Sequence, residues 1–176
     1  MRVIFLDIDG VLNSASWFKA RDKDDSKSES VFEHHSNDLS PWLVTTFESL
    51  MAFAIKEEDT RIVLSSTWRT LFDLDEMYRL LDKCIQSHFN RRISFPREAF
   101  IDKTPIGLPG QKFSEHIIRG KEIKWWLDNN QRVTSYVILD DDADMLPEQK
   151  HNFVHTTWRE GMTVQHAMKA LRILNE

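Results

Sequence analysis

The chain has 176 residues and a formal net charge of −5; hydrophobic residues make up 41% of it and charged residues 29%. This length suits a single domain with one core, and the negative charge provides no general attraction to nucleic acid or to an anionic membrane. The single cysteine, Cys84, excludes an internal disulfide, and no apolar run approaches the ~18 residues of a membrane span, so we expect a cytoplasmic protein.

The N-terminal half begins with a predicted buried strand over residues 3–6, a short apolar run that ends at Asp7. A polar insert follows at about residues 14–37. Its part from Arg21 to Glu33 is dense in Asp, Lys, Ser and Glu, as in flexible segments, and we expect His34 and His35 to be solvated. Apolar residues at helical spacing predict a helix over residues 39–55, and the apolar run 61–65 predicts a second buried strand.

The C-terminal half continues this alternation. Helices are predicted over residues 75–85 and 115–127, with an irregular loop rich in proline and glycine over residues 96–110. A third buried strand is predicted over residues 136–140, a weaker candidate strand lies at 152–154, and a last helix begins after Thr163. Alternating strands and helices predict an α/β fold, a single Rossmann-like domain over residues 1–176 with a parallel sheet covered by helices on both faces and a minimal cap.

Polar side chains end all three of the predicted buried strands. Asp7, Ser65 and Asp140 stand at these positions, and in parallel sheets the ligand site lies beyond the carboxyl ends of the strands. We therefore expect two acids and a hydroxyl in one crevice. No P-loop or dinucleotide-binding glycine sequence occurs, which argues against those two classes of nucleotide-binding protein.

Asp7 and Asp9 are the strongest candidates for chemistry. Two carboxylates spaced by two residues suit magnesium, whose coordination shell phosphate oxygens and waters would complete. One carboxylate can attack phosphorus, and the other can protonate the leaving oxygen and then activate water. Asp-x-Asp-Gly is also common in plain turns, but the apolar strand before it and residues 11–13 after it favour the catalytic interpretation.

The segment after the second strand adds substrate-binding candidates. Ser65 can hydrogen-bond a phosphoryl oxygen, and Ser66 could share that role. Arg69 could clamp a substrate phosphate, or it could simply pair with an acid at the surface. Trp68 is interpreted as a packing residue rather than a platform for stacking bases.

A basic pair and an acidic run complete the candidate site. Arg119 and Lys121 are alternative cations for offsetting phosphate charge. Four acids then lie within residues 140–144 and repel one another unless a cation or water separates them. Asp140 is the first candidate metal ligand in this run and Asp141 the second, whereas the other two acids are expected further from the metal.

Phe5-Leu6-Asp7-Ile8-Asp9-Gly10-Val11-Leu12-Asn13 resembles the first motif of the haloacid dehalogenase (HAD) superfamily in its phosphatase form. The other three motifs of that superfamily have counterparts here in the expected order. The resemblance implies an aspartyl-phosphate mechanism with Asp7 as nucleophile and Asp9 as general acid/base. It also implies roles for Ser65 as the second motif, for Arg119 in preference to Lys121 as the third, and for the Ile8 carbonyl, Asp7, Asp9, Asp140 and Asp141 as ligands of Mg²⁺.

The likeness extends from residue 2 to about residue 147 and is strongest to small, nearly capless members such as the HAD domains of RNA-repair proteins. Residues 104–105, 119–123 and 139–145 carry this closer likeness. It implies a phosphomonoester hydrolase that acts on a nucleotide, a nucleic-acid end or a small phosphomonoester, without an obligate protein partner. The insert and residues 107–117 are distinctive and leave the substrate open. The alternative is a catalytically inactive module that binds phosphate or nucleic-acid ends.

Overall fold

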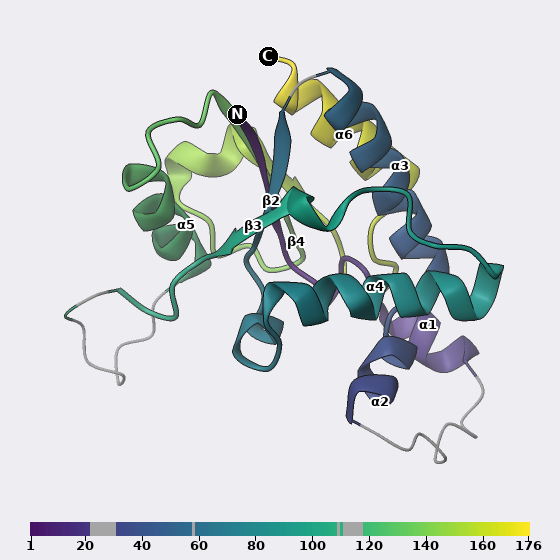
Figure 1. Ribbon diagram of the computed structural model, residues 1–176. Helices are drawn as coiled ribbons and strands as arrows, with labels where there is room; N and C mark the ends of the chain where they lie inside the picture. Colours follow the sequence, from purple (N-terminus) through teal and green to yellow (C-terminus); the bar gives the residue numbers. More distant parts are fainter. Residues whose placement is uncertain (22–30, 58, 109, 111–117) are drawn as a thin grey trace.

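A parallel five-stranded sheet forms the centre of the protein. The computed structural model describes residues 1–21, 31–57, 59–108, 110 and 118–176 (Figure 1). The strands are β1 (Arg2–Leu6), β2 (Thr60–Leu64), β3 (Phe100–Lys103), β4 (Ser135–Asp140) and β5 (Phe153–His155), in the spatial order β3-β2-β1-β4-β5. Leu6 at the end of β1 lies opposite Leu64 of β2 and Leu139 of β4. The residues that follow these strands are therefore level with one another at one edge of the sheet.

Helices cover both faces of the sheet. They are α1 (Ala15–Ala20), α2 (Val31–Asp38), α3 (Pro41–Glu57), α4 (Leu74–Phe89), α5 (Arg119–Asp128) and α6 (Val164–Leu174), with short 3-10 helices η2 (Thr67–Thr70), η3 (Arg97–Ala99) and η4 (Pro147–Asn152). Helix α5 lies on one side of the sheet, and α3 and α6 lie side by side on the other (Figure 1). No helix in the described part of the chain is both long and apolar enough to cross a membrane.

The apolar strands are buried on both faces because alternate side chains enter two separate cores. Ile4 and Leu6 belong to the larger core, which also contains side chains of α3, α4 and α6. Val3 and Phe5 point into the smaller core under α5, where the ring of Phe5 meets that of Trp126 edge to face at 5.4 Å. This arrangement confirms the predicted Rossmann-like α/β fold.

The predicted elements match the structure closely at three strands and at the last helix. Thr163 caps α6 as predicted, because its hydroxyl accepts a hydrogen bond from the backbone N–H of His166. The weak candidate at residues 152–154 is strand β5. Strand β3 was missed inside the loop predicted over residues 96–110. It is a four-residue edge strand with Ile101 and Asp102 exposed, so it lacks the apolar run that marks the central strands.

The polar insert contains two helices that its composition did not predict. Ser14 caps α1 by accepting a hydrogen bond from the backbone N–H of Trp17 at 3.2 Å, and α2 packs against α4. Residues 22–30, the centre of the predicted flexible segment, lie outside the described residues. The helix predicted over residues 115–127 begins at Arg119 among the described residues, since residues 115–117 also lie outside them.

The first turn of α5 is packed tightly against the loop that follows β4. The side-chain amide of Gln149 donates to the carbonyl of Gly120 at 2.8 Å, and its oxygen accepts from the N–H of Leu146 at 2.8 Å. A Cβ atom added at Gly120 would lie 2.5 Å from the backbone nitrogen of Leu146 and 2.6 Å from the side-chain oxygen of Gln149. Only glycine therefore allows the helix to start this close to the loop.

We predict that Gly120→Ala destabilises the protein. Overpacking typically lowers the free energy of unfolding by about 1–3 kcal/mol, and each kcal/mol lowers Tm by roughly 2–4 °C in a chain of this size. Helix propensity alone would give the opposite sign. Thermal melts test this, with Lys121→Ala at the exposed neighbouring position as the control. A Gly120→Ala protein as stable as that control would contradict the close approach.

Candidate active site

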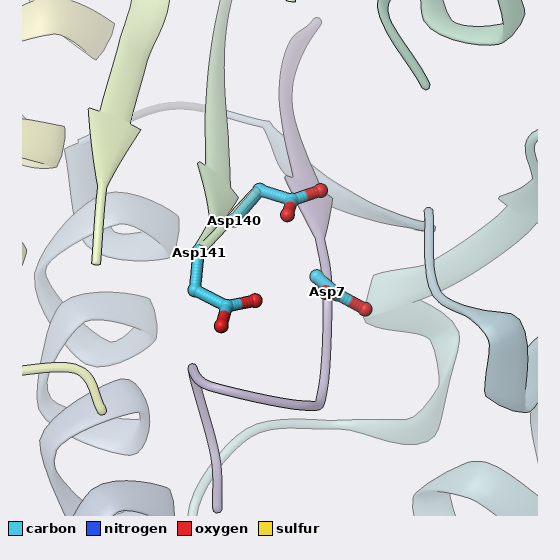
Figure 2. Close-up of side chains that lie close together, drawn as sticks. All are labelled: Asp7, Asp140 and Asp141. Atoms are coloured by element: carbon cyan, nitrogen blue, oxygen red, sulfur yellow. The ribbon is translucent and has the colours of Figure 1, made fainter. Parts of the chain in front are cut away.

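Three carboxylates meet at the carboxyl edge of the sheet. Asp7 follows β1, Asp140 ends β4, and Asp141 comes directly after it (Figure 2). One oxygen atom from each lies within 4.8 Å of the other two. Backbone hydrogen bonds continue the ladder past the strands and hold this edge in place, from Asp7 N to Leu139 O at 3.0 Å and from Ser65 N to Leu6 O at 2.8 Å.

Burial opposes the ionisation of this cluster. Asp7 is 6% exposed and Asp140 only 1%. Burial raises the pKa of Asp7 to about 6, although a hydrogen bond with Ser66 and the charge of Arg119 hold it lower than burial alone would. Burial, followed by the charge of Asp7, raises the pKa of Asp140 to about 8, and burial also raises the pKa of Asp141.

The cluster has the donor atoms that a hard divalent cation requires. Oδ2 of Asp140 is buried and has no hydrogen-bond partner in the part of the chain that the structure describes. Carboxylate oxygens are preferred ligands of magnesium, and a cation among them would favour the ionised forms that burial opposes. The residues present at this edge of the sheet therefore fit a magnesium ion.

The turn after β1 brings the first motif against Asp141. Gly10 has a φ of +65°, and a Cβ atom there would lie 2.2 Å from Cγ of Asp141, so this position requires glycine. The Ile8 carbonyl accepts backbone hydrogen bonds within the same turn, the shortest at 2.8 Å from Leu12 N. The resemblance implies that this carbonyl is a metal ligand, and this stays a prediction.

Asp9 is held separately from the three clustered carboxylates. Its Oδ1 accepts a hydrogen bond from Nδ2 of Asn13 at 2.8 Å. The indole N–H of Trp68 lies 3.2 and 3.1 Å from its two oxygens. The sequence indicated that Trp68 packs, and it is only 6% exposed. Its bond to Asp9 was missed, because no local pattern links residues 59 positions apart.

A guanidinium group flanks the acidic cluster. Arg119 begins α5, and its backbone N–H donates to Oδ2 of Asp144 at 2.8 Å. Its Nε lies 3.8 Å from Oδ2 of Asp140, and its Nη1 lies 3.6 Å from Oε2 of Glu122. The other candidate cation, Lys121, is exposed. Of the two, Arg119 is therefore the one that the structure places beside the carboxylates.

Arg69 is buried rather than at the surface. It is 8% exposed, and its Nη2 donates to Oε2 of Glu122 at 2.7 Å. Glu122 also accepts from the backbone N–H of Gly107 at 2.8 Å, so it joins two arginines and a loop. Burial and the charge of Arg119 lower the pKa of Arg69. Glu122 was not a predicted site residue, although its position three residues after Arg119 could have indicated a pair.

Buried side-chain donors without partners lie around the same edge of the sheet. Among the described residues, Ser65 Oγ, Thr104 Oγ1, Arg69 Nε and Arg119 Nη1 have no hydrogen-bond partner. Thr104 follows β3 next to Ser65, since Leu64 pairs with Lys103 and the N–H of Thr104 donates to Leu64 O at 3.0 Å. Leaving a buried donor unpaired costs about 1–3 kcal/mol, and an anion with several acceptor oxygens would satisfy such donors.

Sequence prediction treated the two neighbouring serines as sharing one role, and it assigned no role to Thr104, although residues 104–105 carry part of the closer family likeness. Ser66 is fully buried, and its hydrogen bond lowers the pKa of Asp7. Its hydroxyl also caps η2 by accepting from the N–H of Trp68. Ser66 therefore supports Asp7 and Trp68, whereas the hydroxyls of Ser65 and Thr104 are without a partner among the described residues.

Comparison with known proteins agrees with these features. The family model described as the HAD domain in Swiss Army Knife RNA repair proteins matches residues 3–167. No curated protein and no solved structure matches the chain. Because the family model covers nearly the whole length, the chain belongs to the family of HAD domains found in Swiss Army Knife RNA repair proteins. This family is part of the HAD superfamily and is of the phosphatase type of hydrolase.

Proposed function

We propose that this protein hydrolyses phosphate monoesters with the help of magnesium and that its substrates are phosphorylated ends of nucleic acids. One observation carries the proposal. Three clustered carboxylates, suited to a cation, share the edge of the sheet with buried donors that have no hydrogen-bond partner among the described residues, suited to an anion. A phosphoryl group bound to magnesium satisfies both halves of such a site.

Magnesium, when bound by Asp7, Asp140 and Asp141, would offset the negative charge that otherwise keeps a carboxylate away from a phosphate. In the first step, an oxygen of Asp7 attacks phosphorus, the bond to the ester oxygen breaks, and Asp9 gives that oxygen a proton. In the second step, Asp9 takes a proton from water, which attacks phosphorus and releases inorganic phosphate and free Asp7. Asp9 was also a predicted ligand, but its carboxylate is held by Asn13 and Trp68 outside the cluster.

The buried donors would hold the phosphoryl group during this reaction. Ser65 and Thr104 offer hydroxyls from the ends of neighbouring strands, and Arg119 offers a guanidinium N–H from the first turn of α5. Arg69 would act indirectly. Both Arg69 and Arg119 pair with Glu122, so Arg69 helps to position Arg119. Fixed donors of this kind stabilise the charge that develops in the transition state.

The family supports a nucleic-acid end as the substrate, because its description refers to RNA repair. A free nucleotide is the competing substrate and carries the same phosphate group. The net charge of −5 gives no general attraction to nucleic acid, so we expect recognition to depend on the phosphate and its nearest nucleotides.

We predict that the purified protein releases phosphate from a phosphorylated oligonucleotide with added magnesium and that Asp7→Asn abolishes this activity. Loss of a nucleophile typically lowers turnover by roughly 10⁴-fold or more. Initial rates should be measured with and without EDTA, on RNA and DNA with 3′ or 5′ phosphates, on free nucleotides and on an aryl phosphate. Asp128→Asn, an exposed carboxylate paired with Lys124, is the control. Full activity of Asp7→Asn would exclude the nucleophile, and preference for free nucleotides would exclude the proposed substrate class.

We predict that Arg119→Ala loses much more activity than Lys121→Ala. Arg119 lies beside Asp140, and its Nη1 is buried without a hydrogen-bond partner among the described residues, whereas Lys121 is exposed. Removing a donor from a transition-state site typically costs about 10²–10³-fold in kcat. Steady-state kinetics of the two variants on one substrate test the assignment. A larger loss in Lys121→Ala would reverse it.

Without magnesium, Asp7 and Asp140 should make the fold less stable as pH rises. Their pKa values lie at about 6 and about 8 instead of 3.8, so the folded protein keeps protons that the unfolded chain releases. The stability they contribute is fully present below the unfolded pKa and is lost as pH rises through the folded values. In EDTA, Tm should therefore fall between about pH 5 and pH 8, and it should fall less in Asp140→Asn.

Magnesium chloride should raise Tm more at pH 8 than at pH 5, because deprotonated carboxylates bind the ion. Asp140→Asn should lose this increase, and Asp128→Asn should keep it. Equal pH dependence in wild type and Asp140→Asn, with no effect of magnesium on either, would contradict the assigned cluster.

A further inference from the structure

The carboxylate of Asp9 is bonded by side chains from two different segments, Asn13 in its own turn and Trp68 from beyond β2. We propose that Trp68 is a positioning residue for Asp9 and that His35, on helix α2 of the polar insert, keeps Trp68 in place. This inference rests on the proposed function, in which Asp9 transfers the protons. It assigns the insert a part in the chemistry.

The indole N–H of Trp68 lies almost equally far from the two oxygens of Asp9, at 3.2 and 3.1 Å. Asn13 binds one of these oxygens at 2.8 Å. An ionised carboxylate has about four acceptor sites, so two donors fix its orientation and still leave room for the leaving oxygen or a water. Because an indole N–H only donates, Trp68 can hold the carboxylate without competing for the proton that Asp9 transfers.

Trp68 is itself fixed from two sides. Its carbonyl accepts from the N–H groups of Leu71 and Phe72 at 3.0 and 3.1 Å, and its ring packs at 5.9 Å from that of Phe72. On the other side, the ring of His35 lies 5.1 Å from Trp68 and 5.2 Å from Phe72. Sequence analysis placed His35 in solvent, but it packs between α2 and η2, and the insert thereby contacts the residue that binds Asp9.

Mispositioning Asp9 should harm some substrates more than others. A leaving group that is a weak base departs without a proton, whereas an alkoxide such as a sugar oxygen needs one from the general acid. The first step, in which Asp7 displaces the leaving group, determines kcat/KM when it is irreversible. The dependence of kcat/KM on the leaving group therefore reports on proton donation by Asp9 and not on the later attack of water.

The test variant is Trp68→Phe, which keeps an aromatic ring and removes the N–H group. We expect its kcat/KM to fall by about 10-fold or more for a 3′- or 5′-phosphorylated oligonucleotide, but by no more than the roughly 10²–10⁴-fold that general acid catalysis contributes. For p-nitrophenyl phosphate, whose leaving group needs no proton, we expect a change of less than about 3-fold. Trp42→Phe, at a tryptophan that is 66% exposed on α3, is the matched control and should change neither value.

His35→Ala tests the support from α2 without touching the hydrogen bond itself. We expect the same selectivity as in Trp68→Phe but a smaller loss, and no loss in His34→Ala, the exposed neighbour on the same helix. If thermal melts show that Trp68→Phe does not fold, His35→Ala alone tests the positioning role. Equal losses on both substrates, or none, in the folded variants would overturn the positioning role. Failure of the proposed function itself would appear separately, as absent wild-type turnover or full activity in Asp7→Asn.

Discussion

Three carboxylates whose oxygens lie within 4.8 Å of one another repel strongly in a buried site, and the structure offsets that repulsion from several directions. The carboxylate of Asp7 accepts a hydrogen bond from the backbone N–H of Ile8 at 2.8 Å, and that of Asp140 accepts one from the backbone N–H of Asp142 at 2.9 Å. Arg119 adds a positive charge beside Asp140. These contacts do not fully offset burial or, at Asp140, the charge of Asp7, because the pKa values of Asp7 and Asp140 stay raised. A cluster that is incompletely neutralised by its own protein is one that gains stability from a bound cation.

The segment directly after β2 supports much of this arrangement. Ser65 presents a hydroxyl with no partner among the described residues, Ser66 binds Asp7, and Trp68 binds Asp9. The side chain of Arg69 donates a hydrogen bond to Glu122 on α5. These side chains diverge because the chain leaves a strand, in which successive residues face opposite sides, and enters the tight 3-10 helix η2. A short stretch at the centre of the sheet can therefore reach Asp7, Asp9 and Glu122.

The parts of the site that could be predicted are those that follow apolar runs. Residues 3–6, 61–65 and 136–140 marked three strands, and parallel order then brought Asp7, Ser65 and Asp140 to one edge. Thr104 was not predicted as a site residue, because β3, which it follows, is a short edge strand without such a run. Trp68 and Glu122 escaped prediction because their partners are far away in sequence. The residues alone left Arg119 and Lys121 as alternatives, and the preference for Arg119 came from the resemblance. The structure places Arg119 beside Asp140 and leaves Lys121 exposed, since positions two apart on a helix face different directions.

In the proposed function, metal binding and proton transfer depend on different parts of this fold. The carboxylate cluster is supported from β1, β4 and the first turn of α5, all of which belong to the central sheet and the helix covering it. Asp9 is supported by Trp68, which packs against His35 on α2 of the insert. A change in the insert can therefore affect the protonation of the leaving group while the metal site stays intact.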